Sequence, residues 1–167
     1  MTEEISLRPM TRALCHALFD GWQNDPAVYR DPARCQPYRY DPDAVDRYFD
    51  EKQEPTRVVL AVMLGEEPIG EIHLKHIDPT QGTCALGIHL KCDAVKNKGY
   101  GTRAEALALD YAFHALGLRT VYADALIGNT RSRHVLEKAG FRFVEERDGF
   151  RYYRCDRQNS EKNDALR

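Results

Sequence analysis

A basic loop with two glycines opens directly into a long helical pattern, and this junction constrains the fold more than any other part of the chain. Gly99 and Gly101 leave the backbone open to a ligand, and Lys96 and Lys98 add positive charge beside them. The alanine- and leucine-rich pattern that follows, from about Thr102 to Leu116, is typical of a buried helix. The first N–H groups of a helix have no internal partner and favour an anion. The junction therefore predicts a binding site for phosphate.

A dinucleotide site is an alternative, because the run from Gly99 to Ala104 also fits the pattern G-x-G-x-x-A. Asp124 follows roughly where a ribose-binding acid would stand. In a dinucleotide site, however, the strand runs straight into the first glycine, whereas this apolar run ends at Leu90 and a polar connection reaches Lys98. Too little chain follows to form the second half of a doubly wound sheet. An ordinary loop before a core helix is a third interpretation.

Hydrophobic periodicity predicts about seven strands and about four helices. The two strands on either side of the central helix should be parallel and joined by a right-handed crossover. Gly87 lies inside a predicted strand and indicates a bulge or the close approach of a ligand. The expected strands are 4–9, 57–64, 69–77, 83–90, 120–126, 141–145 and 150–155, and the expected helices begin near Thr11 and Pro42 or span 102–116 and 130–138.

The length and charge of the chain limit its class. At 167 residues it suits a single domain, which we expect to span residues 1–157, followed by a polar, disordered tail at 158–167. A net charge of −2 gives no reason to expect nucleic acid as a partner. The five scattered cysteines lack a C-x-x-C spacing, so we expect no metal. No apolar run could span a membrane and no secretory signal is present, so we expect a cytoplasmic protein with no membrane partner.

The order of the elements and two motifs resemble the GCN5-related N-acetyltransferase (GNAT) superfamily. Lys96-Asn-Lys-Gly99-Tyr-Gly101 matches its acetyl-CoA signature, except that Lys96 replaces glutamine or arginine, and Asn129 to Phe141 is similar to its next helix. The resemblance covers about residues 4 to 156. It implies an α/β (α+β) fold with a single mixed, mostly antiparallel twisted sheet and a central β-α-β unit that binds acetyl-CoA. Within the superfamily, the chain looks most like the branch of the ribosomal-protein N-terminal acetyltransferases.

The resemblance implies a reaction in which a primary amine attacks the thioester of acetyl-CoA directly, without a metal. The acceptor would be the N-terminal amine of a peptide or protein, as in the resembled branch. A small amine such as a polyamine, an amino sugar or an antibiotic is an alternative acceptor. A non-catalytic acyl-CoA-binding module is an alternative from another class, and a homodimer is a family-level expectation.

The resemblance places the donor site on the loop and on the elements beside it. Backbone N–H groups of the loop would hold the pyrophosphate, and a strand N–H would meet the oxyanion of the reaction. Asn129 would hold the pantetheine arm or simply cap its helix. The residues expected to bind the donor are Ile88, His89, Leu90, Lys96, Lys98, Gly99, Tyr100, Gly101, Thr102, Asn129 and Ser132.

The reaction requires a base, because an alkyl amine has a pKa of ~10.4 and is protonated at neutral pH. Glu71 is the favoured base, since a charge among apolar strand residues needs a task or a partner. The alternatives are Asp124, Glu145 and Glu146.

Two further roles come from the variable parts of the pattern. Leu136 stands where many superfamily members carry the tyrosine that protonates the departing thiolate, and the resemblance carries that role to Ser132. The acceptor pocket is expected in the region of the first helix. Its candidates, which could equally belong to the core, are Trp22, Tyr29 and Tyr38.

Overall fold

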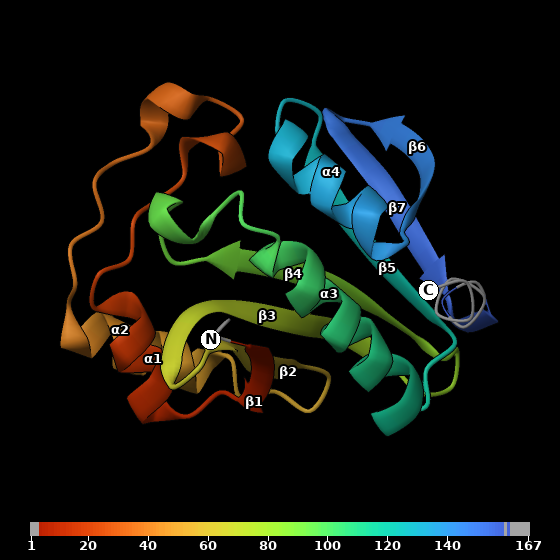
Figure 1. The fold of residues 1–167 in the computed structure, drawn as a ribbon, viewed down its shortest axis with the longest axis horizontal. Helices are drawn as coiled ribbons and strands as arrows, with labels where there is room; N and C mark the ends of the chain where they lie inside the picture. The colour runs from red at the N-terminus through yellow and green to blue at the C-terminus, as the bar shows by residue number, and fades with distance from the viewer. Residues whose placement is uncertain (1–3, 159, 161–167) are drawn as a thin grey trace.

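The computed structural model describes residues 4–158 and 160, and its elements follow the expected order (Figure 1). Most of the expected disordered tail therefore lies outside the described residues. The strands are β1 (Ile5–Pro9), β2 (Val58–Leu64), β3 (Glu67–Asp78), β4 (Thr83–Leu90), β5 (Thr120–Leu126), β6 (Arg142–Arg147) and β7 (Phe150–Asp156). The main helices are α1 (Arg12–Phe19), α2 (Pro42–Glu51), α3 (Tyr100–Asp110) and α4 (Thr130–Ala139).

The strands form one mixed sheet in the order β1-β2-β3-β4-β5-β7-β6. Within the described chain, β4 and β5 are the one parallel pair, and α3 crosses between them. The other neighbouring strands are antiparallel. The predicted α+β class, the mostly antiparallel sheet and the central β-α-β unit are thus confirmed.

β4 and β5 pair over only part of their length. The last rung of their ladder joins Leu86 to Ala123, although β4 continues to Leu90 and β5 continues to Leu126. The sheet therefore opens between the two strands at this end, next to the start of α3.

Of the two alternatives predicted for Gly87, the bulge is wrong, and the close approach of a ligand stays a prediction. Gly87 pairs with His73 in an even stretch of the β3–β4 ladder. The irregularity lies between Lys75 and Asp78, where His76 takes a left-handed φ of 53°. What distinguishes the neighbourhood of Gly87 is instead the separation of β4 from β5.

α3 begins two residues before the expected start. Gly99 ends the preceding loop with a φ of 81°, a conformation that glycine adopts at little cost, and Tyr100 is already helical. Ala104, Ala108 and Ala112 are fully buried, so the helix can lie close to the sheet. The last turn, Tyr111–Ala115, is a π-helix.

α2 and α3 pack on opposite faces of β3. Glu71 and His73 contact Tyr48 of α2, whereas Ile72 and Leu74 belong to the core cluster that includes the buried face of α3. Successive residues of a strand point to opposite faces, so β3 presents a polar pair to one layer and an apolar pair to the other.

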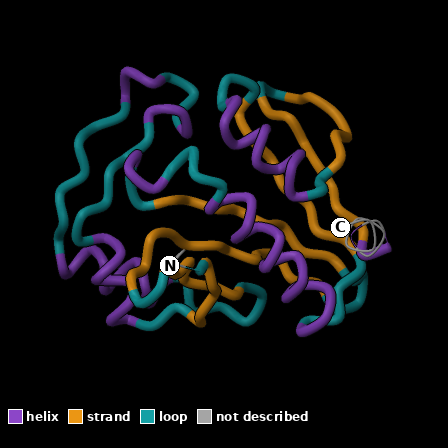
Figure 2. The backbone as a smooth tube through the Cα atoms, in the orientation of Figure 1, coloured by secondary structure: helices purple, strands orange, loops and turns teal. Residues whose placement is uncertain are grey.

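A long connection joins α1 to α2 and is visible as a teal path in Figure 2. α1 ends at Phe19, because Gly21 has a φ of 119° and turns the chain away. The connection contains two short 3-10 helices, Pro26–Val28 and Pro32–Arg34. None of the helices in the described part of the chain is long and apolar enough to cross a membrane.

Candidate active site

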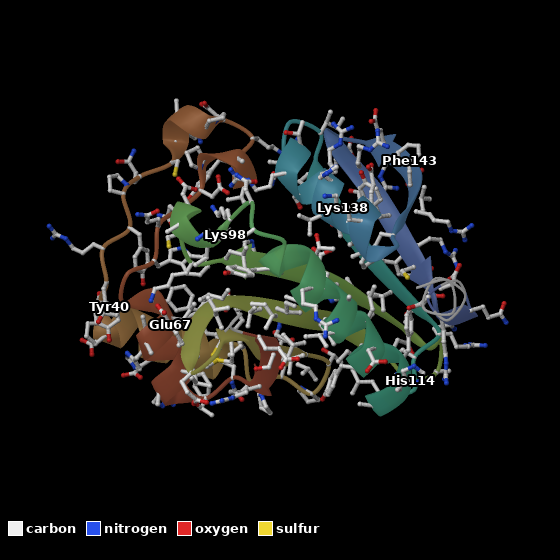
Figure 3. The ribbon with its side chains drawn as sticks, in the orientation of Figure 1. Tyr40, Glu67, Lys98, His114, Lys138 and Phe143 are labelled. Carbon is white, nitrogen blue, oxygen red and sulfur yellow. The ribbon has the colours of Figure 1, made fainter. Side chains whose placement is uncertain are left out.

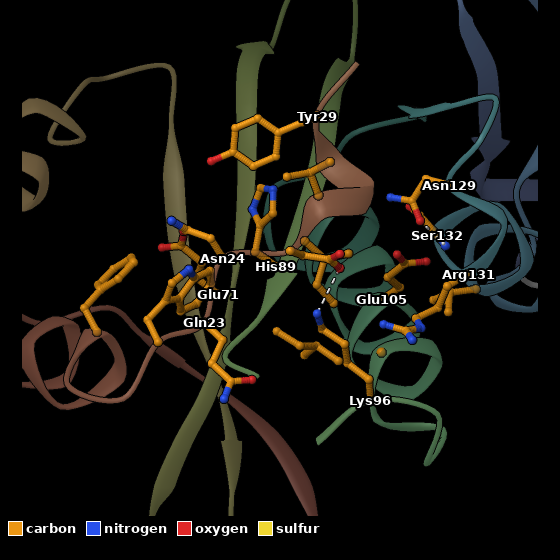
Figure 4. Close-up of a pocket in the computed structure, with 18 of the residues that line it drawn as sticks. Gln23, Asn24, Tyr29, Glu71, His89, Lys96, Glu105, Asn129, Arg131 and Ser132 are labelled. Carbon is orange, nitrogen blue, oxygen red and sulfur yellow. Dashed lines mark hydrogen bonds and ion pairs between the residues drawn. The ribbon is translucent and has the colours of Figure 1, made fainter. Parts of the chain in front are cut away.

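A pocket of about 300 Å³ lies where β4 separates from β5 (Figure 4). Its walls come from the loop after α1, from β3 and β4, and from the facing parts of α3 and α4. Because the opening passes through the sheet, the pocket joins the layer of α1 and α2 to the layer of α3. One ligand can therefore reach side chains of both layers.

A second, open cleft adjoins this pocket and reaches the first turn of α3. Gly99, Gly101 and Thr102 line the cleft, and no side chain caps the helix at Gly99. Asn97 also lines it and has a φ of 61°, so two left-handed residues bend the loop into a concave backbone. Such a backbone, with uncapped N–H groups, suits an anion. Gly101 and Leu90 line both the pocket and the cleft.

Basic side chains of α4 also line the cleft. Arg131, His134 and Lys138 line it, and the sequence reasoning singled out none of them. Lys98, which was expected beside the anion, is exposed and is not among the residues that line the pocket or the cleft (Figure 3). The side chain of Tyr100, in contrast, packs against the core cluster. The backbone of both residues could take part in anion binding.

Glu71, the favoured base, is buried in the pocket wall. Its Oε1 accepts a hydrogen bond of 2.7 Å from the Tyr48 hydroxyl. Its Oε2 lies 3.2 Å from Nε2 of His73 but lacks the alignment of a good hydrogen bond, so a lone pair is left for a ligand. Burial alone would raise the pKa of Glu71, but His73 and Tyr48 stabilise the carboxylate and hold its pKa below the usual value. Glu71 is therefore ionised at neutral pH.

The neighbours of Glu71 form a chain of polar contacts. Nη1 of Arg57 lies 3.0 Å from Nδ1 of His73, and Nε2 of His73 lies 3.0 Å from the Tyr48 hydroxyl. A guanidinium can only donate, so Nδ1 accepts and the proton of the neutral imidazole is on Nε2. Arg57, His73 and Tyr48 together hold the Glu71 carboxylate in one place.

His89 lies opposite Glu71 in the β3–β4 ladder and also lines the pocket. Its side chain keeps exposed surface, yet burial of the ring by surrounding protein lowers its pKa, against the raising effect of the Glu71 charge. The imidazole is therefore neutral at neutral pH and can accept a proton.

Lys96 lines both the pocket and the cleft, but its charge is already paired. Its Nζ lies 2.9 Å from Oδ2 of Asp25 and 3.4 Å from Oδ1 of Asp93 (Figure 4). Burial, the largest single influence, would raise the pKa of Asp25, but the contacts with Lys96 and the Ala27 backbone N–H together lower it. Lys96 thus fastens the loop after α1 to the loop before α3, which differs from the free positive charge expected beside a phosphate.

Asn129 caps α4, since its Oδ1 accepts a hydrogen bond of 3.2 Å from the Ser132 backbone N–H. It also lines the pocket and the cleft, so a contact with the donor is compatible with its capping role. Ser132 lines the pocket, whereas Leu136 is buried in the core cluster.

The structure divides the remaining candidates. Trp22 and Tyr29 line the pocket, but Tyr38 packs in the small core between α1 and α2, against Phe19.

The alternative bases lie away from the pocket. Asp124 is exposed on β5, opposite Tyr152 of β7, and is not among the residues that line the pocket. Glu145 and Glu146 lie on the exposed strand β6. Glu71 is thus the expected carboxylate that the fold brings to the pocket.

The sequence reasoning also missed Tyr48 and Glu105 of the pocket wall. Tyr48 stands on α2 without any motif, so no local signal connects it to Glu71. Glu105 interrupts the apolar side of the central helix, and this polar residue at a buried position was a signal that could have been used. In the described residues, no group of three or more His, Cys, Asp or Glu side chains could hold a metal ion.

Comparison with known proteins identifies the family. A family model described as an acetyltransferase (GNAT) domain matches residues 4–142. The chain belongs to the GNAT acetyltransferase family. The resemblance to this superfamily is thereby confirmed. The match does not identify the branch of the superfamily, so the ribosomal-protein branch is not confirmed. Like the fold, it supports an N-acetyltransferase that uses acetyl-CoA.

A curated relative is the probable N-acetyltransferase YjcK of Bacillus subtilis (strain 168), which is 48% identical over 48 residues. The match covers 29% of this chain and 26% of the relative, so it spans about a quarter of that protein's length.

Two solved structures share the fold at low sequence identity. One is the spermidine N-acetyltransferase of Vibrio cholerae in complex with CoA and spermine, with a TM-score of 0.76 and 18% identity over 94% of this chain and 98% of that chain. The other is the aminoglycoside acetyltransferase AAC(6')-Ib in complex with coenzyme A, with a TM-score of 0.73 and 21% identity over 96% of this chain and 99% of that chain.

Proposed function

We propose that the protein transfers the acetyl group of acetyl-CoA to a primary amine by direct attack. The observation that carries this proposal is the pocket at the β4–β5 opening. One of its ends adjoins an uncapped helix N-terminus, and its other end holds the ionised, buried carboxylate of Glu71. The first feature suits the phosphates of the donor, and the second suits an ammonium acceptor.

In this proposal the pyrophosphate rests on the backbone N–H groups of residues 98–102, and Arg131 of α4, which lies 4.0 Å from Asp93, adds charge. Asn129 and Ser132 adjoin the pantetheine arm. Acetyl-CoA supplies the activated thioester, and the residues of this chain orient it. The residues present fit this donor, because the uncapped first turn of α3 lines the cleft and Gly101 adds no bulky side chain where the pocket and the cleft meet.

A strand N–H at the opening would stabilise the oxyanion. Lys91 donates its backbone N–H to Ile69 on the β3 side, so the alternation of a strand turns the N–H groups of Ile88 and Leu90 toward the gap left by β5. By the same alternation the N–H of His89 turns toward β3. One oxyanion donor contributes ~3 kcal/mol to lowering the barrier.

Glu71 would take the proton of the acceptor ammonium, directly or through a water molecule. Its lowered pKa makes it a weak base, so it must pass the proton on rather than keep it. The neutral imidazole of His89, on the neighbouring strand, is available to receive it. Asp124 has no part in this proposal because it lies outside the pocket.

The acceptor side of the pocket is aromatic. Trp22, Tyr29 and Tyr48 line it beside Glu71, and aromatic faces together with a carboxylate bind a cationic amine. A peptide or protein N-terminal amine is one candidate, favoured by the sequence resemblance to the ribosomal-protein branch. A small amine is the second, favoured by the solved relatives that are a spermidine acetyltransferase and an aminoglycoside acetyltransferase.

An acceptor panel with a thiol-release readout tests this function. Purified protein is incubated with acetyl-CoA and with polyamines, aminoglycosides or peptides that have free N-termini, and free thiol is measured. Amine-dependent release supports the proposal and names the acceptor class. Acetyl-CoA binding without release for any amine would instead indicate a non-catalytic acyl-CoA-binding module. The homodimer and the cytoplasmic location stay predictions, to be checked by light scattering and by fractionation.

A further inference from the structure

Glu105 of α3 is a buried carboxyl that the proposed reaction has not yet used. Its exposed fraction is 0%, and neither of its side-chain oxygens has a hydrogen-bond partner among the described residues. It lines the pocket, and in Figure 4 its carboxyl end is directed toward the side where Asn129 and Ser132 lie. A buried polar group without a partner is costly. Its place in the pocket wall indicates a partner that arrives with the ligand.

The Glu105 carboxyl keeps its proton at neutral pH. Burial raises its pKa to about 8, and no neighbouring charge opposes this shift. Among the elements packed on α3, β1 carries Arg8, which pairs with Glu66 instead. The charged or titratable side chains that share the pocket wall with Glu105, none of them hydrogen-bonded to it, are Asp25, Tyr29, Tyr48, Glu71, His89, Lys96 and Arg131.

Glu105 stands about one helical turn after Gly101, so both residues lie on the side of α3 that faces α4. A Cβ at Gly101 would be 3.5 Å from Val135 of α4, which fixes that direction. The next residue of α4, Leu136, stands where many family members carry the tyrosine acid. α4 therefore brings no tyrosine to this wall at that position, while α3 brings a protonated carboxyl from the opposite side.

We propose that Glu105 is the acid that protonates the departing sulfur of coenzyme A, an inference that rests on the proposed function. The amine nitrogen bonds to the acyl carbon, the carbon–sulfur bond breaks with its electron pair going to sulfur, and the Glu105 O–H proton goes to sulfur. The two protons that the ammonium nitrogen gives up pass by way of Glu71 to solvent, and Glu105 takes one proton back from solvent. The products are an amide and a thiol, with both carboxyl groups restored.

The acid strengths favour Glu105 over Ser132 for this role. A thiol has a pKa of ~8.5, close to the value for Glu105, so proton transfer between them is nearly balanced. Ser132 lines the same wall, but an alkyl hydroxyl does not ionise in the ordinary pH range. Its hydroxyl can relay a proton only if another group supplies one, and Glu105 is such a group.

Binding of coenzyme A and of desulfo-coenzyme A, which lacks the sulfur, separates this role from a structural one. In calorimetric titrations at pH 7, the wild-type protein should bind coenzyme A about threefold more tightly than the desulfo form, through an O–H to sulfur contact. Glu105→Leu should bind both equally. Asp110→Asn, which removes an exposed carboxyl from the same helix, should keep the preference. Retention of the full preference in Glu105→Leu would overturn the proposal.

Glu105→Gln gives the second test, because it keeps the size and a donor but has no proton to give. It should bind coenzyme A like the wild type and lose about 100-fold in kcat. Wild-type kcat should decline above about pH 8, and this decline should be missing in the variant. A variant with wild-type kcat and the same decline contradicts the proposal. If the wild type binds neither form of coenzyme A, the proposed function itself fails and this inference fails with it, a result distinct from losing the sulfur preference alone.

Discussion

The Tyr48 hydroxyl on α2 donates a hydrogen bond of 2.7 Å to Glu71 on β3, and this contact fixes the carboxylate at the wall of the pocket. The two residues come from different layers of the protein, since α2 covers one face of β3 and α3 covers the other. Because Tyr48 binds Oε1 of Glu71, Oε2 stays available to the acceptor. Together with His73, which lowers the pKa of Glu71 more strongly, the Tyr48 contact keeps the buried carboxylate ionised.

Tyr48→Phe should shift the acid limb of the pH profile. The Tyr48 hydrogen bond is one of the contacts that lower the pKa of Glu71, so its loss lets that pKa rise. The protonated, inactive form of Glu71 then persists to higher pH. The acid limb of kcat/KM should therefore move to higher pH. Tyr40→Phe, which removes a hydroxyl bonded to His16 outside the pocket, is the control and should leave the limb in place.

Glu71→Gln should lower turnover by about 100-fold near neutral pH and by less at alkaline pH, where the free amine is already present. The measurement is the pH dependence of kcat with a saturating acceptor. Glu67→Gln removes an exposed carboxyl from the same strand and should behave like the wild type. If the ratio of variant kcat to wild-type kcat stayed constant across the pH range, Glu71 would be excluded as the base.

Asp25→Asn should destabilise the protein by ~1–2 kcal/mol, because it leaves the buried Lys96 with Asp93 as its remaining ion-pair partner. Asparagine can still cap the 3-10 helix through Ala27, so the loss reports the ion pair. Urea denaturation measures it. Asp31→Asn is the matched control, since Asp31 caps the second 3-10 helix in the same way but is exposed. If both variants lost the same free energy of unfolding, the ion pair between Asp25 and Lys96 would contribute nothing to stability.

Glu105→Gln should stabilise the protein more at pH 8 than at pH 5. The folded-state pKa of Glu105 is raised from 4.5 to about 8, so between these values the folded protein holds a proton that the unfolded chain has released. The free energy of unfolding of the wild type therefore falls as pH rises through this range. The variant lacks this dependence and should gain ~2–4 kcal/mol relative to the wild type between pH 5 and pH 8. Urea denaturation measures both proteins at the two pH values. If the difference in free energy of unfolding between the variant and the wild type were the same at pH 5 and pH 8, Glu105 would titrate normally.

The strands and helices were largely predictable because their signals are local. β4 matches its predicted bounds, and α4 differs by one residue, since capping and apolar alternation act within a few positions. The missing bulge at Gly87 shows the limit of such signals. A glycine in a strand indicates that something unusual happens there, but the separation of β4 from β5 depends on a partner strand far along the chain.

The pocket was only partly predictable, because its contacts join distant segments. Glu71 could be chosen for its apolar surroundings, yet Tyr48 stands 23 positions earlier and carries no motif. The pairing of Lys96 with Asp25 spans 71 positions, so the charge of Lys96 looked free in the sequence. Glu105 had a visible signal, a carboxyl on the buried side of a helix, whose meaning depends on the pocket beside it.

Calorimetric titration of acetyl-CoA into the wild type, Gly101→Ala and Gly101→Glu tests the central assignment most directly. A Cβ at Gly101 makes only an ordinary contact with Val135, so the alanine variant should fold and bind acetyl-CoA within a few fold of the wild type. Glutamate puts bulk and negative charge where the pocket meets the cleft, and it should abolish binding while the protein stays folded. Equal binding by the wild type and Gly101→Glu, or no binding by the wild type, would contradict the assignment of this site to acetyl-CoA.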